Sequence, residues 1–463
     1  MDINELPFKH AFIGGAKMNK FKNGFIFGTA TAAYQVEGAF NEGGRTSSIW
    51  DTFSKTKGKV FMGDTGDTAC DHYHRFKSDV EILKEIGVNS YRFSISWSRI
   101  FPSKDEYNPE GMKFYKDLIS DLKEKNITPA ITLYHWDLPQ WAEDLGGWEN
   151  RDCAYWFQDY CTKVFEELGQ DVSLWITHNE PFCASLVGNY MGVHAPGNKD
   201  LKKALMVSHH LLLSHGLVVK AFRKFKFVNG NIGITLNLTP VYAASNSEED
   251  ILATKINDGF SNRWFLDPVL RGSYPKDMIQ FYEEIVGKLE YIVPGDLEII
   301  STEMDFLGVN YYSRSKVEYS ADSELKFQGI DGGKEKTAMG WEICPDSLYE
   351  LLIRIQEEYT KLPLYITENG AAFNDKVTED NKIHDIDRIN YIKVHLQALQ
   401  KFIEGGGNLK GYYLWSFMDN FEWAYGYSKR FGMVYVNYGT QERIMKDSAI
   451  WYKNVIKTGS LDN

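Results

Sequence analysis

Short apolar runs alternate with longer amphipathic segments along most of this 463-residue chain. Eight of the short runs are nearly continuous in apolar and β-favouring residues, which is typical of strands covered on both faces. The predicted strands are residues 25–29, 90–94, 130–134, 174–177, 232–236, 306–309, 364–367 and 411–415.

The segments between these runs have helical periodicity. Residues 73–86 place Phe76, Val80, Leu83 and Ile86 on one face, and Gly87 follows as a stop signal. The other predicted helices are residues 111–125, 154–168, 201–225, 347–359 and 388–402. This alternation predicts an α/β fold, a single (β/α)8 TIM barrel. A doubly wound open sheet is the alternative, but no GxGxxG turn follows the first strand.

We expect one barrel domain over residues 21–463, because the chain has no internal repeat and no Pro- or Ser-rich linker. Residues 1–20 are expected to form an N-terminal extension outside the core. This extension has no long apolar stretch and no clear cleavage site, so it lacks the pattern of a signal peptide.

Two carboxylates stand where predicted strands end. Glu180 closes the apolar run in "WITHNEP", and Glu368 closes the run in "LYITENG". Burying a carboxylate is costly unless it is paired or hydrogen-bonded. Two such positions far apart in sequence therefore suggest groups that are gathered for acid/base or nucleophilic chemistry.

Other polar and aromatic residues follow the same predicted strands. In a parallel barrel, reactive groups sit at the carboxyl ends of the strands. The residues near these ends are Gln35, Glu37, Arg92, His135, Trp136, Asn179, Asn310, Tyr312, Trp415 and Glu422. We expect them to converge with Glu180 and Glu368 on one mouth of the barrel.

The composition narrows the possible partners. The formal net charge is −12, and an acidic surface argues against nucleic acid or an anionic membrane as partner. No apolar run approaches the length of about 18 residues that a membrane span needs. Aromatic residues make up 14% of the chain, which suits either core packing or flat platforms for sugar rings.

The five cysteines indicate neither a disulfide framework nor a zinc knuckle, because their number is odd and no CxxC occurs. This usage favours a reducing compartment, and we expect a cytoplasmic protein. In "CDHYHRF", the residues Cys70, His72 and His74 lack a convincing fourth ligand at metal-site spacing, so we predict no metal.

Seven motifs, in the correct order, resemble the retaining β-glucosidases of glycoside hydrolase family 1 from about residue 21 to about residue 457. They are "FGTATAAYQVEGA", "YRFSISWSRIFP", "TLYHWDLPQW", "THNEP", "FLGVNYYS", "YITENG" and "LWSFMDNFEWAYGYSKRFG". The resemblance implies that the barrel is a catalytic domain that needs no metal or organic cofactor.

The same resemblance implies roles for individual residues. Glu180 matches the general acid/base of the family, and Glu368 matches the nucleophile. Arg92, Asn310 and Tyr312 are implied to hold the nucleophile carboxylate. The residues implied in substrate binding are Gln35, His135, Trp136, Asn179, Trp341, Trp415, Glu422, Trp423 and Phe431.

Hydrolysis with retention needs two carboxyl groups about 5–5.5 Å apart that differ in ionisation at rest. Glu368 must be charged to attack the anomeric carbon, and Arg92 and Tyr312 nearby would favour that form. Glu180 must begin protonated, and a charged Glu368 close to it would raise its pKa.

A charged Glu422 in a sugar pocket can accept two hydroxyl hydrogen bonds and would repel a 6-phosphate. Relatives that cleave 6-phosphoglycosides carry a Ser at this position, and a Tyr two places after a downstream Lys. Here the Lys is present as Lys429, but Phe431 occupies the Tyr position. We therefore expect an unphosphorylated sugar.

His178 in "THNEP" stands where the family more often carries an apolar residue. Successive side chains of a strand point to opposite faces. We therefore expect His178 to face the barrel wall, away from the sugar.

The predicted function is that of a retaining exo-β-glycosidase. We expect it to release β-D-glucose from the non-reducing end of cellobiose and of short or aryl β-glucosides, which are small-molecule substrates. β-Galactosidase or β-fucosidase activity within the same family is the alternative. Cleavage of 6-phospho-β-glucosides or of thioglucosides, and a non-catalytic sugar-binding barrel, are less favoured because Glu422 and both carboxylates are present.

Overall fold

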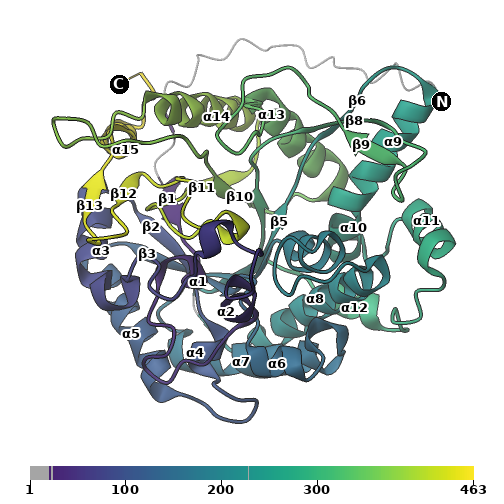
Figure 1. The fold of residues 1–463 in the computed structure, drawn as a ribbon, viewed down its shortest axis with the longest axis horizontal. Helices are drawn as coiled ribbons and strands as arrows, with labels where there is room; N and C mark the ends of the chain where they lie inside the picture. The colour runs from purple at the N-terminus through teal and green to yellow at the C-terminus, as the bar shows by residue number, and fades with distance from the viewer. Residues whose placement is uncertain (1–19, 22–23, 228, 463) are drawn as a thin grey trace.

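The computed structural model describes residues 20–21, 24–227 and 229–462. The predicted N-terminal extension, residues 1–20, lies outside the described residues except for Lys20. In the described part of the chain, eight parallel strands close into a barrel with helices around it (Figure 1). The predicted (β/α)8 TIM barrel is confirmed.

The barrel strands lie side by side in chain order, and the last strand, β11, closes the barrel against the first, β1. They are β1 (Ile26–Ala30), β2 (Ser90–Ser94), β3 (Thr128–Tyr134), β4 (Leu174–Asn179), β5 (Asn231–Asn237), β7 (Phe306–Asn310), β10 (Leu364–Asn369) and β11 (Leu409–Trp415). Every predicted strand is confirmed to within two residues at each end.

Strand β4 illustrates why these segments are strands. All six of its residues are buried, because one face meets the barrel interior and the other meets the surrounding helices. Trp175 and Ile176 are fully buried, and large apolar side chains on successive positions are favoured only where both faces of a sheet are covered.

The helices surround the barrel and connect its strands (Figure 1). They are α1 (Ala33–Val36), α2 (Ile49–Ser54), α3 (His72–Ile86), α4 (Trp97–Ile100), α5 (Pro109–Glu124), α6 (Gln140–Asp144), α7 (Asp152–Leu168), α8 (Leu201–Phe222), α9 (Glu248–Asp258), α10 (Trp264–Arg271), α11 (Lys276–Val286), α12 (Asp296–Ile300), α13 (Pro345–Arg354), α14 (Ile386–Glu404) and α15 (Asp447–Thr458). Short 3-10 or π turns are η1 (Phe61–Gly63), η2 (Gly147–Glu149), η3 (Cys183–Met191), η4 (Gly259–Arg263), η5 (Ile355–Tyr359) and η6 (Trp423–Tyr425).

Local signals define several helix ends. Asn108 caps α5 by accepting a hydrogen bond from the N–H of Glu110 at 3.2 Å. Asp200 caps α8 by accepting from the N–H of Lys203 at 3.0 Å. Helix α3 ends at Gly87, whose φ of 84° lies in the left-handed region that glycine adopts without strain.

All six predicted helices are present, with two corrections. The predicted helix 201–225 ends at Phe222, and the predicted helix 347–359 is α13 followed by the π turn η5. The helices that were not predicted are α1, α2, α4, α6, α9 to α12 and α15. Pro268 lies inside α10, and a proline within a helical pattern normally marks a helix end, so the sequence conceals this helix.

Two small sheets, also not predicted, lie in loops outside the barrel strands. One contains β6 (Val241–Ala243), β8 (Ser315–Tyr319) and β9 (Phe327–Gly329), and the other pairs β12 (Val434–Val436) with β13 (Arg443–Met445). Their strands are three to five residues long, which is too short for a clear alternating pattern.

Helix α8 is long and apolar enough to cross a membrane by length and composition alone, although its polar His and Ser residues interrupt any continuous apolar run. Within the fold, 89% of its apolar window is buried. It packs against the neighbouring helix α7 and strand β4, as the core helix of a large barrel does.

Candidate active site

Glu368 lies at the carboxyl end of β10 with only 3% of its surface exposed. Arg92 Nη1 donates to its Oε1 at 2.6 Å, and the Tyr312 hydroxyl donates to its Oε2 at 2.6 Å. The pairing of β10 with β7 shifts register between Ile366 and Glu368, and such an irregularity re-aims a side chain. Each carboxylate oxygen is therefore held by its own donor.

Glu180 follows β4 and turns the chain into η3. Its φ of 50° lies in the left-handed region, which is costly for a residue with a side chain and is found most often at functional sites. Its N–H donates to the Thr235 carbonyl at 2.9 Å. Its Oε1 accepts a hydrogen bond from Asn310 Nδ2 at 2.6 Å. The carboxyl group thus has a neutral donor where Glu368 has a cationic one.

A network of amides connects the two carboxyl groups. Asn179 Oδ1 accepts from Arg92 Nη2 at 2.7 Å and from Asn310 Nδ2 at 3.0 Å. The resemblance implies that Asn310 holds Glu368, and in the structure the Asn310 amide supports Glu180 as well as Glu368. The hydroxyl of Thr367 occupies Asn310 Oδ1 at 2.7 Å, so the amide protons point to Asn179 and Glu180. Asn310 nevertheless lowers the pKa of both carboxyl groups.

The two carboxyl groups have different electrostatic environments. Burial, and next the proximity of Glu368, raise the pKa of Glu180 to about 8. The prediction of a raised pKa agrees with this direction, but burial rather than the neighbouring charge is the larger cause. Burial also raises the pKa of Glu368, and the Arg92 guanidinium and the Tyr312 hydroxyl oppose that rise. Glu368 is therefore the member of the pair that ionises first.

Aromatic side chains surround the carboxyl groups. The Trp136 and Trp423 rings lie 4.6 Å apart between centroids, and the His135 and Trp415 rings lie 5.8 Å apart and stacked. Trp136 and Trp423 have φ values of 76° and 47°, so, like Glu180, they are held in a strained conformation. The Trp415–Ser416 peptide bond is cis. Burial lowers the pKa of His135 well below its usual value, which keeps the imidazole neutral.

These residues line a cavity of about 660 Å3. Most of the predicted site residues contribute to its wall: His135, Trp136, Glu180, Asn310, Tyr312, Trp341, Glu368, Trp415, Glu422, Trp423 and Phe431. Gln35, Arg92 and Asn179 are buried directly behind the wall. Arg92 reaches Glu368, the Asn179 amide lies 3.0 Å from His135 Nε2, and Gln35 donates to the Phe421 carbonyl at 2.7 Å.

Glu422 lines this cavity, but its ionisation differs from the expectation. Burial, followed by repulsion from Glu368 and Glu180, raises the pKa of Glu422 to about 8. The carboxyl group is therefore mostly protonated at neutral pH. Lys429 does not pair with it, because its Nζ donates to the Ala338 carbonyl at 2.6 Å.

Several lining residues were not predicted. Cys183 lies one helical turn beyond Glu180, and Asn237 ends β5, so strand-end reasoning could have found both. Arg314 and Glu342 form an ion pair at 2.9 Å, and Lys316 lies nearby in β8. These charged residues come from loops and a short strand outside the barrel, where the sequence contains no positional signal.

His178 is fully buried, and its ring packs against Phe157 at 4.7 Å between centroids. Its Nε2 lies 2.7 Å from the Ser214 hydroxyl of α8. The expectation that it faces the barrel wall is confirmed. His72 pairs with Asp79, and among the described residues no group of three His, Cys, Asp or Glu side chains could hold a metal ion.

Comparison with known proteins identifies the family. Residues 17–460 match the family model described as Glycosyl hydrolase family 1. The chain belongs to glycosyl hydrolase family 1. The family membership makes it a retaining glycosidase, so the resemblance seen in the sequence motifs is confirmed.

Individual relatives support the same assignment. A β-glucosidase A of Acetivibrio thermocellus is 51% identical, over 94% of this chain and 98% of that protein. A 1,4-β-D-glucan glucohydrolase of Thermotoga neapolitana is 49% identical, over 96% of this chain and all of that protein. The crystal structure of a β-glucosidase of the same family from Exiguobacterium antarcticum B7 is 53% identical, covers 96% of this chain and 99% of its own, and superposes with a TM-score of 0.94. The predicted β-glucosidase activity of this family member is confirmed.

Proposed function

We propose that Glu368 is the nucleophile and Glu180 the general acid/base of a double displacement. In this proposal the enzyme releases glucose from the non-reducing end of cellobiose and of short or aryl β-glucosides. The observation that carries the proposal is the unequal support of the two carboxyl groups. Glu368 accepts from a guanidinium and a phenol, whereas Glu180 accepts only from the neutral Asn310 amide and Cys183 thiol among the described side chains.

The first step forms a covalent bond between Glu368 and the anomeric carbon. The ionised carboxylate attacks this carbon while the protonated Glu180 transfers its proton to the departing glycosidic oxygen. Esterification then removes the negative charge of Glu368, and with it one of the causes that raise the pKa of Glu180. In the second step Glu180 accepts a proton from water, and the water oxygen displaces Glu368 from the sugar.

The proposed glucose site lies among Trp415, Trp423 and Glu422 on the inner part of the cavity wall. Aromatic rings offer apolar faces to the C–H groups of a sugar, and the carboxyl group of Glu422 can exchange hydrogen bonds with its hydroxyls. A dianionic 6-phosphate would have to be buried among these acidic side chains, while Lys429 donates to the Ala338 carbonyl, so the site disfavours it.

We further propose that the enzyme acts in the cytoplasm, in carbohydrate metabolism that degrades cellulose-derived oligosaccharides. All five cysteines are free thiols and four of them are buried, which suits a reducing compartment. The net charge of −12 argues against nucleic acid or an anionic membrane as partner. When the source cells are fractionated, we expect the activity in the cytosolic fraction.

A panel of aryl glycosides tests the proposed substrate. We expect kcat/KM to be highest for the glucoside, lower for the galactoside and the thioglucoside, and lowest for the 6-phosphoglucoside. Proton NMR of the first-formed sugar should show the β-anomer, because two displacements restore the original configuration. A first-formed α-anomer, or a preference for the 6-phosphoglucoside, would contradict the proposal.

A further inference from the structure

Gln35 of α1 is a fully buried amide beside the sugar cavity. Its Nε2 donates to the Phe421 carbonyl at 2.7 Å and to Asn420 Oδ1 at 3.0 Å, which uses both amide protons. Among the described residues, no protein group pairs with its buried Oε1. A buried polar atom without a protein partner indicates that a bound molecule supplies the missing hydrogen bond.

Asn420 determines which way round the Gln35 amide lies. Asn420 Nδ2 donates to the Ser416 hydroxyl at 3.1 Å and to the Met418 carbonyl at 2.9 Å. Its Oδ1 is therefore turned toward Gln35. A flipped Asn420 would place its side-chain oxygen against the Met418 carbonyl oxygen, and its NH2 group against the NH2 group of Gln35. Both amides therefore have one favourable orientation.

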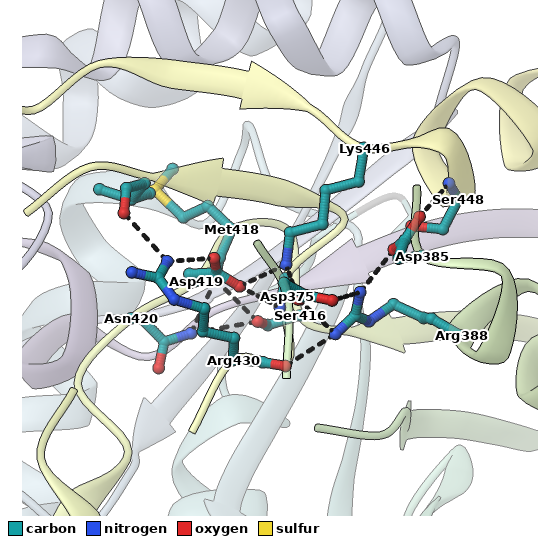
Figure 2. Close-up of polar contacts among 12 residues, drawn as sticks. Asp375, Asp385, Arg388, Ser416, Met418, Asp419, Asn420, Arg430, Lys446 and Ser448 are labelled. Atoms are coloured by element: carbon teal, nitrogen blue, oxygen red, sulfur yellow. Dashed lines mark hydrogen bonds and ion pairs between the residues drawn. The ribbon is translucent and has the colours of Figure 1, made fainter. Parts of the chain in front are cut away.

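The neighbouring residue Asp419 belongs to a buried charge cluster of Asp375, Asp385, Arg388, Asp419, Arg430 and Lys446 (Figure 2). Lys446 Nζ lies between two carboxylates, 2.7 Å from Asp419 and 2.5 Å from Asp375. Arg430 Nη1 donates to Asp419 at 2.6 Å. The cluster contains three anions and three cations, so its charges balance.

Asp419 also ties together the two ends of the loop that carries Glu422 and Trp423. Its Oδ1 accepts from the N–H of Gly432 at 3.0 Å, and its own N–H donates to the Val434 carbonyl at 2.9 Å. The loop that provides sugar-binding groups is thus anchored on fixed charges beside Asn420.

We propose that Asn420 is a positioning residue for the substrate: it holds the Gln35 amide so that Oε1 accepts a hydrogen bond from one glucose hydroxyl. Asp419 keeps Asn420 in place through the buried charge cluster. This inference rests on the proposed function, and Asn420 itself acts through Gln35.

The first test compares wild type, Asn420→Leu, Gln35→Ala and the double variant on an aryl β-glucoside and on its series of monodeoxy analogues. We expect Asn420→Leu to lower kcat/KM on the intact glucoside about tenfold, the size of one hydrogen bond. On one analogue, which lacks the hydroxyl bound by Gln35, the loss should vanish. Asn420→Leu should also add nothing further in the Gln35→Ala background.

A purely structural role gives a different pattern. Equal losses on every analogue, or losses that multiply in the double variant, would overturn the proposal. Turnover of the intact glucoside by wild type tests the proposed function separately, because it does not depend on the ratios between analogues.

A matched pair within the cluster tests the part assigned to Asp419. Asp419→Asn and Asp385→Asn each remove one buried negative charge, but Asp385 bonds to Arg388 and Ser448, away from the sugar loop. Both variants should lower the melting temperature. Only Asp419→Asn should reproduce the hydroxyl-dependent loss of Asn420→Leu, and the same loss in Asp385→Asn, or none in Asp419→Asn, would refute this part.

Discussion

The active site and the buried charge cluster both gather carboxyl groups at or beyond the ends of barrel strands, but the ionisation of these groups is controlled in opposite ways. In the cluster, burial alone would raise the pKa of Asp375, but Lys446 and Arg388 hold it below its ordinary value. In the active site, burial and Glu368 raise the pKa of Glu180 to about 8. The number of cations within contact makes the difference.

This contrast separates structural carboxylates from reactive ones. A balanced cluster keeps every group in one charge state over a wide pH range, which suits an anchor. An unbalanced pair leaves one carboxyl group ionised and the other protonated near neutral pH, and a double displacement needs that asymmetry.

Glu368→Gly should have the largest effect on the active site. Removing the nucleophile should lower kcat by on the order of 10⁴- to 10⁶-fold, because no other group can form the covalent intermediate. Steady-state assays on an aryl glucoside measure the loss, and an unchanged melting transition controls for folding. Activity near wild type in this variant would falsify the assignment of the nucleophile.

Glu180→Ala should give a loss that depends on the leaving group. We expect kcat/KM to fall about 10²- to 10⁴-fold on a phenyl glucoside, which needs the proton, and much less on a dinitrophenyl glucoside, which does not. Added azide should partly restore turnover by replacing water in the second step. Equal losses on both substrates would assign Glu180 to binding instead of proton transfer.

Arg388→Met breaks the balance of the buried charge cluster. It removes the guanidinium that pairs with both Asp375 and Asp385, and Lys446 still contacts Asp375 but not Asp385, so the free energy of unfolding should fall by about 3–5 kcal/mol. Urea denaturation measures this change, and the kcat/KM of the folded fraction should change much less than in Glu180→Ala. An unchanged midpoint would show that the cluster adds no net stability.

Tyr312→Phe tests the assigned ionisation states of Glu368 and Glu180 through the pH dependence of kcat/KM. Glu368 must be ionised and Glu180 protonated, so activity falls at low pH as Glu368 gains a proton and at high pH as Glu180 loses one near pH 8. Removing the Tyr312 hydroxyl removes a bond that favours the ionised Glu368, so its pKa rises.

The acid limb should therefore move to higher pH by about one unit or less, while the basic limb stays in place. Tyr311→Phe is the matched control, because the Tyr311 hydroxyl donates to the Cys344 carbonyl at 2.6 Å and not to Glu368. A shift of the same size in both variants, or a shift of the basic limb alone, would contradict the assigned ionisation states.

Much of the site follows from chain order. A residue placed just after a buried parallel strand must lie at the barrel mouth, so Glu180, Glu368 and His135 could be located without coordinates. Arg314 and Lys316 could not, because they come from a loop and a short strand outside the barrel. Their place at the cavity depends on how these segments fold over its rim.

The ionisation of the buried acids was harder to predict than their position. Glu422 was expected to be charged, but its pKa depends on burial and on two other carboxyl groups that are remote in sequence. Asn310 was expected to support Glu368, and only the structure shows that the same amide also supports Glu180, because the Thr367 hydroxyl donates to the Asn310 oxygen and leaves the amide protons for other partners.

By itself, the sequence determined the barrel, its strand positions and the identity of the groups at its mouth, because burial pattern and chain order are local properties. Only the tertiary structure decided which carboxyl group receives a cation, which receives an amide and which loops enclose the cavity. The physical reason is that electrostatic environment and hydrogen-bond pairing depend on distances of a few ångströms between residues far apart in the chain.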